Sequence, residues 1–313
     1  MVSLLGGIFM GWALGANDAS NIFGAAVGAR MVKFWTATIL AGTFVLLGAV
    51  ISGQAGIETL QSLTSFELSQ AVIASVAAAL SVSIMTLAGW PVSTSQAVVG
   101  AIIGVGIMNS QLNISGLGKV VTCWLTTPIG GAFISFVLYK IFAFFYNRSR
   151  ISIFTSDRLM KLCFLAFGSY GAYALGANNV ANVTAVFVGA GKLTVFQAAL
   201  IGGISIALGI LTFSRHVMET VGSKLVKLDP FSALMVSISL ALTIHIYTLI
   251  GVPVSSSQAI IGGLLGIGII KGTNTVSRST LTGIFLAWFL TPVIACVLAL
   301  ALFFVTHLEY VGP

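Results

Sequence analysis

The chain has very little charge for its length. Only 7% of its 313 residues are charged, where a soluble domain carries roughly a quarter. Hydrophobic residues make up 58% of the chain, and apolar stretches long enough to cross about 30 Å of hydrocarbon recur from one end to the other. The shortage of charge excludes a soluble globular domain and predicts an all-α polytopic membrane protein.

Cysteine is scarce as well. The three cysteines, Cys123, Cys163 and Cys296, all fall in apolar segments and show no Cys-x-x-Cys spacing. This pattern argues against a disulfide framework, a redox motif or a structural zinc site. We expect all three to be small packing residues.

Acidic residues are half as frequent as basic ones, with 7 against 14 and a net charge of +7. The basic residues lie in short loops between apolar segments, which indicates orientation in the membrane and not binding to nucleic acid. If the first segment runs from outside to inside, only two basic residues are external, and both termini are external as well. The expected location is the plasma membrane. The cytoplasmic basic residues are then Arg30, Lys33, Lys140, Arg148, Arg150, Arg158, Lys161, Arg215, Lys224, Lys227, Lys271 and Arg278, leaving Lys119 and Lys192 outside.

The sequence repeats itself after a little over 160 residues. Three matches occur in the same order, which predicts two homologous halves, 1–150 and 151–313, that form one membrane domain. The matching pairs are "LGANDASNIFGAAVGA" (14–29) with "LGANNVANVTAVFVGA" (175–190), "GWPVSTSQAVVGAIIGVGI" (89–107) with "GVPVSSSQAIIGGLLGIGI" (251–269), and "WLTTP" (124–128) with "WFLTP" (288–292).

Each half is expected to cross the membrane an odd number of times, which would turn the halves upside down relative to each other as inverted repeats. Two interpretations of 68–108 and its copy 230–270 remain open, because the 93–108 helix would reach only about 24 Å. They are re-entrant hairpins that turn at Pro91 and Pro253, or pairs of full crossings. The predicted segments are 2–29, 34–54, 68–88, 92–108, 116–146, 160–190, 194–214, 230–250, 254–270 and 279–306.

The motif "GANDASN" places polar side chains inside an apolar span. Gly15 and Gly176 are predicted to break their helices there, enclosing an unwound pocket. Asp18 is the one acid deep inside a span, and no lysine or arginine lies in the neighbouring segments. Its expected partner is a transported cation, and oxygen ligands favour sodium; alternatively, the amides only join helices. The candidate sodium ligands are Asn17, Asp18, Asn21, Asn178, Asn179 and Asn182.

The motifs "PVSTSQ" and "PVSSSQ" predict two helix beginnings rich in hydroxyl groups. A helix N-terminus offers unpaired N–H groups and the positive end of the helix dipole, so it can hold an anion without lysine or arginine. The alternative is ordinary capping by serine and threonine. The candidate anion ligands are Ser93, Thr94, Ser95, Gln96, Ser255, Ser256, Ser257 and Gln258.

Other chemistry has weaker support. His245 lies in an apolar segment, where it is either a packing histidine or a proton carrier. The chain contains no His-Glu-x-x-His motif and no paired acids. We therefore do not expect an enzyme, and no cofactor other than transported sodium is expected.

The two copies of GAN[DN]xxN, each followed by GxPVS[ST]SQ, resemble the inorganic phosphate transporter (PiT) family of sodium- or proton-coupled symporters. The resemblance covers essentially the whole chain. It implies an inverted-repeat fold with external termini, a substrate site built from both halves, and a homodimer. One position departs from the family pattern, which usually has aspartate in both copies, because the second copy here has Asn179.

These observations predict a symporter that moves inorganic phosphate into the cell with sodium. The alternatives are a proton-coupled phosphate or sulfate permease and, more remotely, a passive anion channel. The expected partners are phosphate, sodium, the lipid bilayer and a second copy of the chain.

Overall fold

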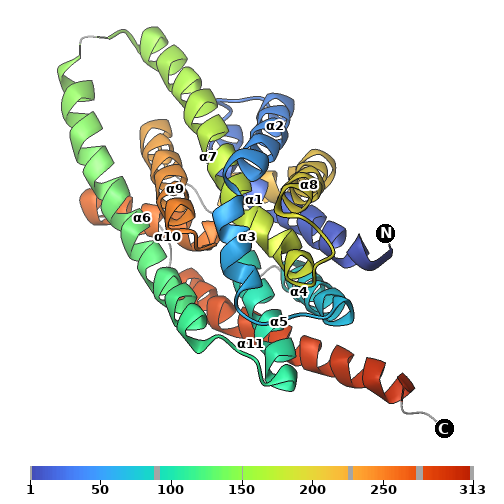
Figure 1. Ribbon diagram of the computed structural model, residues 1–313. Helices are drawn as coiled ribbons and strands as arrows, with labels where there is room; N and C mark the ends of the chain where they lie inside the picture. The colour runs from blue at the N-terminus through green and yellow to red at the C-terminus, as the bar shows by residue number, and fades with distance from the viewer. Residues whose placement is uncertain (1, 88–91, 150, 225–227, 273–277, 311–313) are drawn as a thin grey trace.

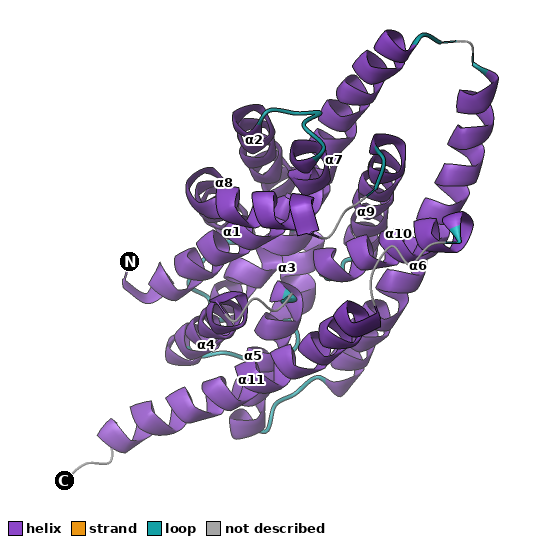
Figure 2. Ribbon diagram, turned by 180° about the vertical axis from the view of Figure 1, so that it is seen from behind, coloured by secondary structure: helices purple, strands orange, loops and turns teal. Residues whose placement is uncertain are grey.

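The computed structural model describes residues 2–87, 92–149, 151–224, 228–272 and 278–310. These residues form eleven α-helices and one short 3-10 helix, with no strand among them (Figures 1 and 2). Seven of the helices are long and apolar enough to cross a membrane. The predicted all-helical membrane fold is confirmed.

The helices follow the predicted apolar segments closely. In the first half they are α1 (Leu5–Gly28), α2 (Phe34–Ser52), α3 (Gln54–Gln61), α4 (Leu68–Leu87), α5 (Thr94–Asn109) and α6 (Ile114–Arg148). In the second half they are α7 (Ile153–Gly189), α8 (Val195–Lys224), α9 (Pro230–Ile250), α10 (Ser256–Lys271) and α11 (Arg278–Tyr310). The short helix α3 was not predicted, and α8 continues beyond its predicted end at 214.

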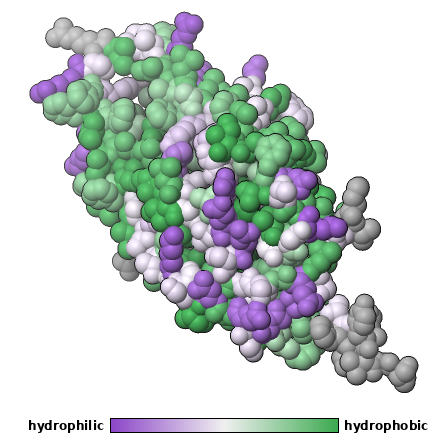
Figure 3. Space-filling view, viewed as in Figure 1, coloured by the Kyte–Doolittle hydropathy of each residue, from purple (hydrophilic) through white to green (hydrophobic). Residues whose placement is uncertain are grey.

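Helices α6 and α7 are longer than a membrane is thick. They contain 35 and 37 residues, which corresponds to roughly 50–55 Å against about 30 Å of hydrocarbon. Their adjoining ends project together at the top left of Figure 1. Lys140, Arg148, Arg158 and Lys161 lie toward these ends, so the projecting part is the charged part. The space-filling view in Figure 3 shows broad hydrophobic areas interrupted by hydrophilic patches.

The predicted helix break at Gly15 and Gly176 is wrong. α1 and α7 run through both positions without interruption. A Cβ atom at Gly15 would lie 2.0 Å from the Ile206 carbonyl oxygen of α8, and one at Gly176 would lie 1.9 Å from the Val45 oxygen of α2. Glycine is therefore needed here because the backbones of neighbouring helices touch.

The two halves interlock through reciprocal contacts. In α5, a Cβ atom at Gly100 would lie 2.2 Å from the Pro292 oxygen of α11, and in α10, one at Gly262 would lie 2.2 Å from the Pro128 oxygen of α6. These four residues are two pairs of repeat-equivalent positions. Each half thus uses the other as its packing partner, and the chain forms one helical body.

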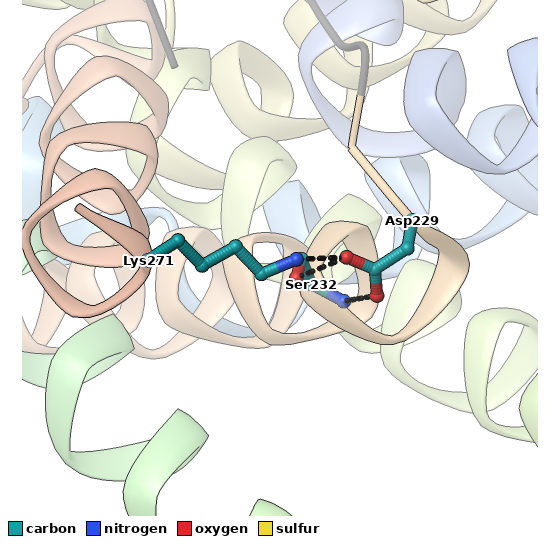
Figure 4. Close-up of polar contacts among 3 residues, drawn as sticks. All are labelled: Asp229, Ser232 and Lys271. Atoms are coloured by element: carbon teal, nitrogen blue, oxygen red, sulfur yellow. Dashed lines mark hydrogen bonds and ion pairs between the residues drawn. The ribbon is translucent and has the colours of Figure 1, made fainter. Parts of the chain in front are cut away.

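Helices α4 and α5 form a helical hairpin, as do α9 and α10. Gln70 near the start of α4 and Asn109 at the end of α5 exchange two hydrogen bonds, of 3.1 and 2.9 Å. At the equivalent place in the second half, Lys271 at the end of α10 forms an ion pair with Asp229, which caps α9 and also accepts bonds from Ser232 (Figure 4).

The two ends of each hairpin therefore lie at the same level. This geometry fits both re-entrant hairpins and pairs of full crossings, because α4 and α9 each contain a stretch long and apolar enough to cross a membrane. Gly251 turns the chain with a φ of 77° after α9, before Pro253 and α10. The predicted turn residue Pro91 of the first hairpin lies outside the described residues.

Candidate functional site

The tips of the two hairpins touch each other. The Ser95 hydroxyl of α5 donates to the Val254 carbonyl oxygen at 3.0 Å, and the Ser257 hydroxyl of α10 donates to the Val92 oxygen at 3.3 Å. The two bonds join repeat-equivalent positions in opposite order. Both serine motifs are consequently brought to one place, although they are separated by more than half of the chain.

Each hairpin tip presents a capped helix beginning. The Ser93 hydroxyl oxygen accepts the N–H of Gln96 at 3.3 Å, and Ser255 accepts the N–H of Gln258 at 3.3 Å. Both serines have extended backbone, as an N-cap requires. Other N–H groups of the first turn have no partner within the helix. The positive ends of both helix dipoles thus lie at the same site.

Asp18 lies beside these helix beginnings. Its side chain is 1% exposed, and its Oδ2 atom accepts bonds from the Thr94 hydroxyl and the Asn179 amide, each at 3.4 Å. It forms no ion pair with any residue that the structure describes. A carboxylate held only by neutral donors in an apolar interior is costly to ionise.

The second asparagine motif joins the same cluster. Asn182 donates to the Asn179 oxygen and to the Ser95 hydroxyl, both at 2.9 Å. In the first half, Asn21 donates to the Ser256 hydroxyl at 3.0 Å. Each asparagine therefore contacts the hairpin tip that belongs to the other half, which makes the cluster a shared product of both repeats.

Three amide oxygens at this place are buried and have no hydrogen-bond partner. They are Oε1 of Gln96, Oε1 of Gln258 and Oδ1 of Asn182. An orphaned buried acceptor costs free energy, and carboxamide oxygens are ligands that hard cations accept. These unpartnered oxygens near Asp18 could therefore coordinate a dehydrated cation or accept a hydrogen bond from a protonated anion.

The two remaining asparagines differ from this cluster. Asn178 accepts the Val254 N–H at 2.9 Å and donates to the Thr248 hydroxyl at 3.2 Å, so it fastens the second hairpin tip to α7. Asn17 is half-buried, and its carbonyl oxygen accepts the Ser20 hydroxyl at 2.7 Å. The sequence interpretation missed Thr248. The repeat carried that signal, because Thr86-Leu87 and Thr248-Leu249 precede the two proline motifs alike.

Almost every candidate side chain is enclosed. Apart from Asn17, each candidate residue is at most 9% exposed, so the site is covered from both sides of the molecule in this conformation. The residues are Asp18, Asn21, Ser93, Thr94, Ser95, Gln96, Asn178, Asn179, Asn182, Ser255, Ser256, Ser257 and Gln258.

His245 lies apart from the hydrogen bonds of this cluster. Its ring packs 5.4 Å from the ring of Tyr170 and 6.3 Å from that of Tyr173. The ring contacts fit a packing role, but the buried Nδ1 atom of His245 has no hydrogen-bond partner in the described part of the chain. The three cysteines are free thiols.

A bundle of membrane-length helices around an enclosed polar site, closed by two helical hairpins, defines a multi-pass membrane transport protein. Residues 14–299 match the phosphate transporter family. The chain belongs to this family. Inorganic phosphate is the substrate that this membership supports.

Individual relatives match this chain over most of its length, but their names give different substrates. The sulfate permease CysP of Bacillus subtilis is 30% identical over 93% of this chain and 84% of its own length. A protein of Methanocaldococcus jannaschii that is named as a phosphate permease is 29% identical over 95% of this chain and 94% of its own. The solved structure of a sodium-dependent phosphate transporter superposes with a TM-score of 0.86 at 25% identity and covers 98% of both chains.

Proposed function

We propose that this protein is a secondary symporter that carries inorganic phosphate into the cell together with sodium. The observation that carries the proposal is the position of Asp18. It is a buried carboxylate without a lysine or arginine partner among the described residues, and it contacts Thr94 at the start of α5. The name of the structural neighbour, a sodium-dependent phosphate transporter, supports the choice of cation.

Sodium would bind first, at Asp18 and the surrounding asparagine oxygens. The ion supplies the positive charge that the protein does not, and it offsets the cost of the buried carboxylate. The unpartnered Asn182 oxygen is available to the same ion. The proposed ligands remain Asn17, Asp18, Asn21, Asn178, Asn179 and Asn182, of which Asn178 would contribute only by loosening its hold on the hairpin tip.

Phosphate would bind between the two hairpin tips. Hydroxyl groups and free N–H groups from both helix beginnings supply donors to the oxyanion. The proposed ligands are Ser93, Thr94, Ser95, Gln96, Ser255, Ser256, Ser257 and Gln258. The unpartnered oxygens of Gln96 and Gln258 can accept a hydrogen bond from the P–O–H group of hydrogenphosphate. Sulfate at neutral pH has no such proton, so these acceptors favour phosphate.

Coupling follows because each ion compensates the other. An empty Asp18 and an anion without a cation are both poorly balanced in an enclosed site, and the effect of each ion on the other must be reciprocal. A membrane potential supplies about 2.3 kcal/mol per charge per 100 mV, so two or more sodium ions could carry a divalent anion inward.

Alternating access would involve the two halves, 1–150 and 151–313, as inverted repeats. The reciprocal contacts at Gly100 and Gly262 support this relation. External termini, a plasma-membrane location and a homodimer complete the proposal. The first rests on the distribution of basic residues, the second on the proposed uptake into the cell, and the last on the family resemblance.

Transport of sulfate or coupling to protons is the second candidate, because the sulfate permease CysP is 30% identical to this chain. The test is uptake of labelled phosphate by proteoliposomes under separately imposed sodium, proton and voltage gradients. We expect accumulation above equilibrium with an inward sodium gradient, and little competition from unlabelled sulfate. Uptake driven equally well by a proton gradient without sodium would contradict the proposed coupling, and uptake that never exceeds the phosphate gradient would indicate a channel.

A further inference from the structure

A basic pocket lies away from the central site, where α1 ends and α2 begins. It has a volume of about 440 Å³, and its lining includes Arg30, Lys33 and Lys161. All three of these side chains are exposed. The ring of Phe34 also lines this pocket, and Arg215 of α8 approaches that ring at 5.6 Å. Among the residues whose side chains the structure describes, the acid Asp157 pairs with Lys161 at 2.7 Å. Three basic side chains in the lining against this one acid give the pocket a net positive charge.

Arg30 occupies a backbone position that glycine would fill more easily. Its φ is 57°, in the left-handed region that a long side chain disfavours. The equivalent residue of the second half is Gly191, with a φ of 68°. The backbone turn is thus the same in both halves, and only the first half places an arginine on it. The turn itself does not require an arginine, so the presence of Arg30 is explained by what its side chain contacts.

Lys33 shows a second departure of the same kind. It is the N-cap of α2 and makes no capping bond, and its charge lies at the positive end of the helix dipole. The equivalent residue Thr194 accepts the Gln197 N–H at 3.2 Å, and the Gln197 side chain accepts the Thr194 N–H at 3.0 Å. The first half therefore lacks the capping box of the second half and has the cationic Lys33, which lines the pocket, in its place.

An apolar groove lies near the basic pocket. It lies between α2 and α7, which pack side by side, and has a volume of about 740 Å³. Its lining includes Leu40 and Phe44 of α2 and Leu165 and Tyr173 of α7. The same two helices contribute to both spaces: Phe34 of α2 and Lys161 of α7 line the pocket, and Leu40 of α2 and Leu162 of α7 line the groove. The two spaces therefore lie near each other along α2 and α7.

The depth of these spaces is marked by Trp35. Its side chain is 61% exposed, and it follows Phe34 at the start of α2. Exposed tryptophans in membrane proteins gather at the boundary between headgroups and hydrocarbon. The basic pocket is then at headgroup depth, and the groove, further along α2, faces the acyl chains.

We propose that this pocket and groove bind one anionic phospholipid. Its phosphodiester group would contact Arg30, Lys33 and Lys161, and one acyl chain would lie between α2 and α7. Positive pockets between helices at the membrane surface bind anionic headgroups in this way. In the predicted orientation the lipid belongs to the inner leaflet. The second half, with Gly191 and Thr194, lacks such a site at its equivalent turn.

The test measures lipid binding to the delipidated full-length protein in detergent by native mass spectrometry. Phosphatidylglycerol and phosphatidylcholine with identical acyl chains are compared, and we expect the anionic lipid to bind more tightly. In the double variant Arg30→Gly with Lys33→Thr, which copies the second half, we expect phosphatidylglycerol affinity to fall about fivefold per charge and on the order of 30-fold in total. Both substitutions suit the local backbone, so the fold is preserved.

The matched control is Lys140→Gln with Lys192→Thr, which removes two charges elsewhere and should leave affinity unchanged. Ala166→Phe, which fills the groove, should weaken binding of both lipids. Equal affinity of the wild type for the two lipids would overturn the proposal, as would unchanged affinity in the double variant. Displacement of the lipid by equimolar inorganic phosphate would instead indicate a free-phosphate site. A groove variant that changes only the oligomeric state would indicate a protein interface.

Discussion

The two halves of the molecule share the residues that hold the central site and differ in charge. Ser93 and Ser255 cap the two hairpin helices alike, each at 3.3 Å. Asp18 in the first half, however, faces Asn179 at the equivalent position of the second. In the proposed mechanism, the shared features would hold the anion symmetrically, and the difference predicts that the stronger cation site belongs to the first half.

The hairpin bases show the same kind of difference. The first closes with neutral side chains, Gln70 and Asn109, whereas the second closes with the ion pair of Asp229 and Lys271 (Figure 4). Asn109 and Lys271 are repeat-equivalent. The two hairpins therefore have the same architecture, but the interactions that close their bases respond differently to pH and salt.

The largest effect is expected when the charge difference is erased. Asp18→Asn makes the two asparagine motifs alike and removes the only carboxylate of the described site. We expect sodium-stimulated phosphate uptake to fall at least about 100-fold, because losing a buried charge partner costs on the order of 3 kcal/mol or more. Initial uptake rates in proteoliposomes measure this effect.

The control for Asp18→Asn is Asp157→Asn, which removes an exposed carboxylate from the same protein. Its uptake should match the wild type. Normal sodium stimulation in the Asp18→Asn protein would show that the carboxylate does not bind the coupling ion.

A smaller effect is expected when both helix caps are removed together. The two hydroxyl groups are proposed donors to phosphate, and each lost hydrogen bond costs on the order of 1 kcal/mol, so Ser93→Ala with Ser255→Ala should weaken phosphate affinity roughly 10- to 30-fold. Sodium affinity measured without phosphate should change much less, since Asp18 is intact. Isothermal titration with each ion would show the contrast, and an equal loss for both ions would mean that the hydroxyl groups serve the fold alone.

Adding the missing charge should strengthen the second half. Asn179→Asp gives both motifs an aspartate, and we expect a few-fold higher sodium affinity and more sodium carried per phosphate. Parallel uptake of labelled sodium and phosphate measures the ratio, and an unchanged ratio would remove Asn179 from the cation site.

The smallest effect concerns the charged hairpin base. Burial tends to raise the pKa of Asp229, but the bonds from Lys271 and Ser232 outweigh it and hold the pKa below its ordinary value. The stabilisation is present above the unfolded-state pKa of about 3.9 and disappears as the pH falls through the lower folded-state pKa.

Asp229→Asn preserves the cap and removes this dependence. Because the pair is partly exposed, the variant should lose less than about 1 kcal/mol at pH 7, and the difference should shrink toward pH 3. Thermal unfolding in detergent at both pH values measures it. Gln70→Glu, at the neutral base, provides the comparison, and equal pH responses of wild type and Asp229→Asn would exclude the ion pair as a pH-sensitive contact.

The sequence predicted the helices and most of the central cluster because both are encoded in repeated, local patterns. Long apolar runs predict helices, and a serine before a helix predicts a cap. Helix α3 was missed because it is short and carries Glu58 among apolar residues. The break at Gly15 was wrongly predicted because glycine serves equally for unwinding and for close packing, and only the position of Ile206 decides between them.

The arrangement of the cluster depended on contacts that no local pattern contains. Asn182 meets Ser95, and Asn21 meets Ser256, across the two halves. Thr248 was missed because its role depends on Asn178, which lies on another helix. The repeat showed which polar residues occur in both halves, but not whether each asparagine contacts the serine motif of its own half or that of the other half.

The most direct test is the thermodynamic link between the two ions in the purified protein. Phosphate dissociation constants measured across a sodium series, and sodium dissociation constants across a phosphate series, should change by the same factor. In the Asp18→Asn variant, measured beside the wild type, this factor should fall to one. A phosphate affinity that stays constant at every sodium concentration in the wild type would contradict a shared site for cation and anion.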